Sequence, residues 1–105
     1  MAKKNQEVNP EDFVWVLTEF KGVDEENFVG LTGPRGEDFV PVTRDREEAQ
    51  ALLARIPART EEGWKRQVET IHRDDIIHQA NQRGFAVYLV SPEGRIEEVL
   101  TGDRL

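Results

Sequence analysis

The sequence contains no cysteine. This absence excludes disulfide bonds, thiolate metal sites and catalytic cysteines. Long apolar runs are also missing, because the longest one, residues 85–90, is far shorter than the ~20 residues that a membrane-spanning helix needs. The first residues carry two lysines with no apolar stretch behind them, which does not fit a secretory signal. By elimination, the sequence predicts a cytoplasmic protein that has no membrane partner.

Positive charge is outnumbered by negative charge. Lys and Arg number 14 against 21 Asp and Glu, so the net charge is −7. Binding to a phosphate backbone depends on clustered cations, and the mean field of this chain has the opposite sign. The one basic group, Arg59 with Lys65 and Arg66, is typical of a solvated stretch. We therefore expect no nucleic-acid partner.

Motifs for phosphate cradles and hydrolase nucleophiles are absent too. Neither G-x-G-x-x-G nor G-x-x-x-x-G-K occurs, and no serine lies in a G-x-S-x-G turn. Three adjacent acids, Asp24, Glu25 and Glu26, lack the alternating spacing of a calcium loop. They predict an exposed loop over residues 21–27. We expect no cofactor.

The remaining pattern predicts one domain, residues 12–105, behind a flexible N-terminal tail, residues 1–11. Runs of β-branched and aromatic residues predict strands over residues 13–20, 28–32, 37–42, 66–71, 85–90 and 95–100. Pro41 has no N–H donor, which predicts that its strand lies at an edge or ends there. Residues 64–72 fit a helix as well as a strand, and we favour the strand because a helix follows so soon.

Two helices are expected. The first begins at a cap formed by Thr43 or Asp45 and ends at Pro57, with one apolar stripe between them. The second covers residues 74–83, with acids in its first turn and a glycine after its end. The order βββαβαββ predicts an α+β fold, in which a mixed, mostly antiparallel sheet of five or six strands carries two helices on one face.

Three segments carry a resemblance to known domains. They are Val14-Trp15-Val16-Leu17, then Phe39-Val40-Pro41-Val42-Thr43 ahead of Glu48-Ala49, and Val87-Tyr88-Leu89-Val90-Ser91-Pro92-Glu93-Gly94. With the order of the elements, they resemble small uncharacterised bacterial α/β domains of the enhanced-serine-sensitivity protein B N-terminal type. The resemblance implies an α/β domain in a bacterial cytosol, and it brings no catalytic residue with it.

One polar cluster has a plausible chemistry. On a helix, Asp75 and His78 share a face at i and i+3, and His72 lies just before them. These side chains suit a divalent metal or an acid–base pair, although no third partner is evident. The simpler interpretation is that the acids stabilise the helix N-terminus and that His78 is a surface residue.

Two tryptophans complete the candidate residues. Core packing is the default for both Trp15 and Trp64, and Trp64, next to Lys65 and Arg66, is the better candidate for an interaction anchor. Because no catalytic constellation is present, we expect a protein-interaction or regulatory module without catalytic activity, which binds a protein partner or itself. The alternative is a small metal-dependent enzyme or a small-ligand sensor that uses His72, Asp75 and His78.

Overall fold

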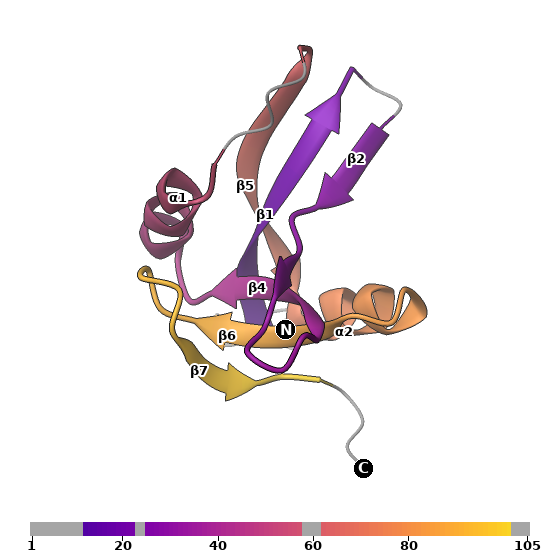
Figure 1. Ribbon diagram of the computed structural model, residues 1–105, viewed down its shortest axis with the longest axis vertical. Coiled ribbons are helices and arrows are strands. Elements are labelled where there is room, and N and C mark those ends of the chain that lie inside the picture. Colours follow the sequence, from indigo (N-terminus) through magenta and orange to yellow (C-terminus); the bar gives the residue numbers. More distant parts are fainter. Residues whose placement is uncertain (1–11, 23–24, 58–61, 102–105) are drawn as a thin grey trace, which may run out of the picture.

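The computed structural model describes residues 12–22, 25–57 and 62–101 (Figure 1). The predicted tail, residues 1–11, lies outside this range. The described residues form seven strands and two helices in the order ββββαβαββ. The elements are β1 (Phe13–Lys21), β2 (Glu25–Phe28), β3 (Leu31–Thr32), β4 (Asp38–Thr43), α1 (Arg46–Arg55), β5 (Trp64–His72), α2 (Arg73–Gln82), β6 (Ala86–Val90) and β7 (Ile96–Val99). The predicted α+β fold with a mixed, mostly antiparallel sheet is confirmed.

β1 is an inner strand of the sheet and has three partners. β5 pairs with it along its whole length, from Phe13 opposite His72 to Lys21 opposite Trp64. On the other side, β2 pairs with the second half of β1 and β4 pairs with the first half. β4 also pairs with β3 and, in parallel, with β6, and β7 follows β6 at the end of the sheet. Figure 1 shows β2, β1 and β5 as a ribbon that rises away from β4, β6 and β7.

The two helices cover opposite faces of the sheet, so the prediction that both pack on one face is wrong. Along β1, the buried Val14 and Val16 belong to the apolar cluster of α2, whereas Leu17 belongs to the cluster of α1. The same alternation runs along β6, where Val87 and Leu89 pack with α2, and Val90 packs with α1. Because successive side chains of a strand point to opposite faces, α1 and α2 lie on different sides. We call these sides the α1 face and the α2 face.

The path of the chain explains this arrangement. β4, β5 and β6 run in the same direction, because β4 and β5 are both antiparallel to β1 and β6 is parallel to β4. The connection through α1 crosses the sheet from β4 to β5, and the connection through α2 crosses back from β5 to β6. Right-handed crossovers that travel in opposite directions must use opposite faces.

Two other local predictions need correction. The predicted loop over residues 21–27 contains most of β2, which pairs with β1 from Lys21 opposite Glu25 to Thr18 opposite Phe28. The predicted strand over residues 28–32 is divided between β2 and β3. It breaks because Val29 bonds to β1, whereas Leu31 pairs with β4, so the chain must change neighbours at this point.

Pro41 lies in the interior of β4, where a strand edge or end was predicted. Its strand continues to Thr43 and is bonded to β6 on one side. On the other side, β3 pairs only as far as Phe39, and β1 pairs only from Val42 onward. Residues 40 and 41 therefore face a gap between two partners, where the missing N–H of a proline removes no ladder bond.

The helix starts agree with the sequence pattern. Asp45 caps α1, and its side chain accepts a hydrogen bond from Glu48 N at 2.8 Å. α2 begins at Arg73, one residue before the predicted start, because β5 leads directly into it and His72 acts as its cap. The ambiguous residues 64–72 are a strand, longer at both ends than predicted. Neither described helix has the length and apolar composition needed to cross a bilayer.

Candidate functional site

The polar residues predicted from the sequence are not gathered into one site. His72 is half-buried at the start of α2, where its Nδ1 accepts a hydrogen bond from Asp74 N at 3.1 Å and its ring meets the edge of Phe13. Asp75 and His78 are exposed on α2. Among the described residues, no group of three or more His, Asp or Glu is arranged to hold a metal ion. Asp74 and Asp75 lie in the first turn of α2, as the simpler interpretation has them, and His72 caps the helix, a role that was not predicted for it.

The two tryptophans lie in different settings. Trp15 is half-buried and packs against the apolar cluster of α1. Trp64 is half-buried at the first residue of β5, opposite Lys21, and it belongs to neither of the two core clusters. Its position draws attention to β5, which is one of the outer strands of the sheet.

The backbone groups of β5 alternate between β1 and the open edge. The Leu17 carbonyl accepts a hydrogen bond from Val29 N at 2.9 Å, so the backbone of Leu17 is directed away from β5. The backbone N–H and C=O of the next residue, Thr18, are therefore directed toward β5. Those of Gln67, which lies opposite Thr18, are directed toward β1. Thr18 Oγ1 also reaches the Gln67 carbonyl oxygen at 3.5 Å. By the same alternation, the N–H and C=O groups directed to the open edge are those of Arg66, Val68 and Thr70.

This edge is long and regular. β5 pairs with β1 over nine consecutive residues without a register shift, and it contains neither proline nor glycine. Within the described residues, β5 pairs only with β1, and no backbone hydrogen bond from another element reaches Arg66, Val68 or Thr70. Unpaired N–H and C=O groups in such a row are a template for another strand.

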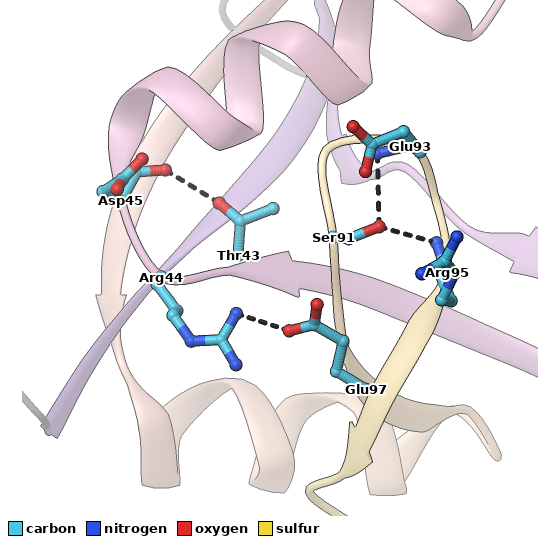
Figure 2. Close-up of polar contacts among 7 residues, drawn as sticks. All are labelled: Thr43, Arg44, Asp45, Ser91, Glu93, Arg95 and Glu97. Atoms are coloured by element: carbon cyan, nitrogen blue, oxygen red, sulfur yellow. Dashed lines mark hydrogen bonds and ion pairs between the residues drawn. The ribbon is translucent and has the colours of Figure 1, made fainter.

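β7, the strand at the opposite end of the sheet, is short and interrupted. It has four residues, and its register with β6 shifts between Leu89 and Val90. Its Glu97 forms an ion pair with Arg44, which follows β4 (Figure 2). Short length, a register irregularity and charged side chains are the features by which proteins protect sheet edges. β5 has the charges but neither of the other two features.

A pair of carboxyl groups lies beside β5 on the α2 face. Glu69 accepts hydrogen bonds from Thr18 Oγ1 at 3.1 Å and from Gln67 Nε2 at 2.6 Å. Burial raises the pKa of Glu69, but hydrogen bonds from Glu26, Gln67 and Thr18 outweigh it, and the pKa is lowered. The pKa of Glu26 is raised, first by its hydrogen bond with Glu69 and then by the repulsion between the two groups. At neutral pH, Glu69 therefore carries a charge that a nearby cation would stabilise.

An open groove lies on the same face at the beginning of α2. Its apolar floor consists of Phe13, Val14, Leu89 and Leu100, and its rim of Arg44, Arg73 and Glu98. Its volume is about 380 Å³. We call it the Arg73 groove.

Comparison with family models, with curated proteins and with solved structures finds no match to this chain. The resemblance to the enhanced-serine-sensitivity protein B type therefore stays a prediction. The open edge of β5, the pairing of Glu26 with Glu69 and the Arg73 groove were not predicted from the sequence. The lack of proline and glycine in residues 64–72 was a visible signal of a regular strand, but which edge that strand would occupy depends on pairings that no local pattern contains.

Proposed function

We propose that this chain is a protein-interaction module that associates through the open edge of β5, with a second copy of the chain as its partner. The observation that carries the proposal is the unbroken row of outward backbone groups on Arg66, Val68 and Thr70. Addition of a strand to an open sheet edge is a recurring mode of protein recognition, in which the main-chain bonds supply affinity and the side chains supply specificity.

The side chains of β5 suit an antiparallel copy of the same strand. A two-fold axis normal to the joined sheet keeps each side chain on its own face of the sheet. Because the same axis relates β5 to its copy, the residue nearest the axis lies opposite its own copy. When that residue is Gln67, Lys65 lies opposite Glu69 of the partner subunit, and symmetry repeats the pair. Arg66 then lies opposite Val68 of the partner subunit, and the outward backbone groups of both can bond.

Neighbouring registers are less favourable. If the two copies of β5 are centred on Arg66 or on Glu69, that residue lies directly opposite its own copy. Two like charges are then opposite each other, which destabilises the strand pairing. Centring it on Val68 removes the contact between Lys65 and Glu69 and leaves the lysine opposite Ile71. The Gln67 register is the one that adds two cations beside the carboxyl groups of Glu69 and Glu26. Each cross-strand pair of opposite charge contributes roughly 0.2–1 kcal/mol.

The first experiment measures association by sedimentation velocity at about 0.15 M salt, where the Debye length of about 8 Å screens the net charge. We expect a concentration-dependent dimer. Lys65→Glu places like charges opposite each other and should raise the dissociation constant at least about tenfold. The double variant Lys65→Glu with Glu69→Lys should restore it. Arg46→Glu is the matched control, because this exposed residue of α1 undergoes the same charge reversal away from β5.

The second experiment tests the register. Because the chain has no cysteine, Gln67→Cys introduces a single thiol. Residues opposite each other in a non-hydrogen-bonded pair have Cα atoms about 4.5 Å apart, within the range for a disulfide. Mild oxidation should give a covalent dimer for Gln67→Cys but not for Gln50→Cys on exposed α1. A wild-type chain that stays monomeric at every concentration, with equal cross-linking of both variants, overturns the proposal.

A further inference from the structure

We propose that the Arg73 groove binds a small amphipathic monocarboxylate, whose apolar body rests on the groove floor and whose carboxylate pairs with Arg73. This site lies away from the open backbone groups of β5, and it does not depend on the association proposed above. Its volume of about 380 Å³ falls within the range of small-molecule sites.

The groove exists because α2 covers only part of its face. Arg73 is the first residue of α2 and stands where the helix leaves the end of β5. Beyond it, the register of β6 with β7 places Leu89 beside Glu98 on the α2 face, and the Leu100 N–H continues the ladder by bonding to the Val87 carbonyl at 2.8 Å. The floor is thus made by strand residues that the helix does not reach.

The two arginines of the rim differ in their partners. The pKa of Arg44 is raised, first through its hydrogen bond with Glu97 and also by the charges of Glu48 and Glu98. Arg73 is half-buried, and no hydrogen bond or ion pair joins its guanidinium to another described residue. Among the described residues that line this groove, Arg73 is therefore the cation that gains most from pairing with an anion.

The composition of the rim selects the ligand chemistry. The planar guanidinium of Arg73 matches a carboxylate with two parallel hydrogen bonds. Arg44 is already paired with Glu97, and Glu98, which also lines the groove, adds a negative charge. The rim therefore suits one negative charge and disfavours a phosphate dianion. The floor, in which Val14, Leu89 and Leu100 are buried, favours an aliphatic or aromatic body over a small hydrophilic acid.

The test is a titration of the full chain with 3-phenylpropionate and with its neutral amide, followed by amide resonances in ¹H–¹⁵N spectra. We expect shifts centred on Phe13, Val14, Leu89 and Leu100. The acid should bind about tenfold more tightly than the amide, because a charge-assisted pair replaces a neutral contact. Inorganic phosphate should shift these resonances less than the acid does at equal concentration.

Variants separate the role of Arg73 from a structural one. Arg73→Gln should bring the acid and the amide to equal affinity while the spectrum keeps its dispersion, and Arg73→Lys should retain part of the preference. Arg83→Gln, at the other end of α2, removes the same charge and should leave the preference unchanged. Equal binding of acid and amide to the wild-type chain, or shifts centred outside the groove, overturns the proposal.

Discussion

β5 and β7 are the outer strands at two ends of one sheet, and their open edges differ in length and regularity. β7 is short, its register shifts beside Val90, and its Glu97 is held by Arg44. β5 is more than twice as long and keeps one register throughout. A long, regular open edge is a template for another strand, whereas a short, interrupted and charged edge is protected against such pairing. β5 is therefore the edge to which a partner strand would add, and β7 contributes Glu98 to the wall of the Arg73 groove.

The largest expected effect tests the backbone directions of β5. Gln67→Pro removes an N–H directed to β1 from the middle of a long strand pair, and it should lower the free energy of unfolding by at least about 1–3 kcal/mol. Thr70→Pro removes an N–H directed to the open edge, so it should leave the fold largely intact while abolishing the dimer. Urea unfolding and sedimentation of both variants check this. If Thr70→Pro is as destabilising as Gln67→Pro, the assigned directions are wrong.

A smaller effect is expected at the turn that leads into β7. The buried Ser91 hydroxyl accepts hydrogen bonds from Glu93 N at 3.2 Å and from Arg95 N at 3.0 Å (Figure 2). Ser91→Ala should cost about 1–3 kcal/mol, because it leaves both donors without this partner. Hydrogen exchange should quicken in β7 and remain unchanged in β5. Equal quickening in both strands would show that the two edges are not independent.

The smallest expected effect is the pH dependence of stability that arises from Glu26 and Glu69 beside β5. The pKa of Glu26 is raised by Glu69, so the stability that Glu26 contributes is present at acid pH and is lost as the pH rises through its folded value. Glu26→Gln removes the repulsion at neutral pH. The variant should therefore be slightly more stable than the wild type at pH 7, and the two should converge below about pH 4. Thermal unfolding between pH 3 and pH 8 measures the difference, and a gap that widens toward acid pH contradicts the assignment.

Much of the secondary structure was predictable, for local reasons. The Asp45 cap and the apolar stripe of α1 are encoded within one stretch of chain. The strand at residues 86–90 and the turn at Ser91 follow equally from neighbouring residues. The errors lie where a segment changes partners, as at Val29, which bonds to β1 while Leu31 pairs with β4. A run of β-branched residues favours a strand, but it does not predict the residue at which that strand ends.

The candidate sites were the less predictable part. His72 and Asp75 attracted attention because they are close in sequence, yet the structure uses His72 to cap α2. The Arg73 groove joins residues from both ends of the chain, including Phe13 and Leu100, so no spacing could indicate it. The partnership of Glu26 with Glu69 depends on β2 and β5 flanking the same strand, which is a property of the topology.

The sequence by itself determined the α+β class, both helices, most of the strands and the lack of thiol chemistry, because propensity, periodicity and composition act over a few residues. Only the tertiary structure decided which strands stand at the edges, that α1 and α2 cover opposite faces, and that no other described residue pairs with the Arg73 guanidinium beside the apolar floor of its groove. These follow from pairings between distant segments and from the handedness of the crossovers between them.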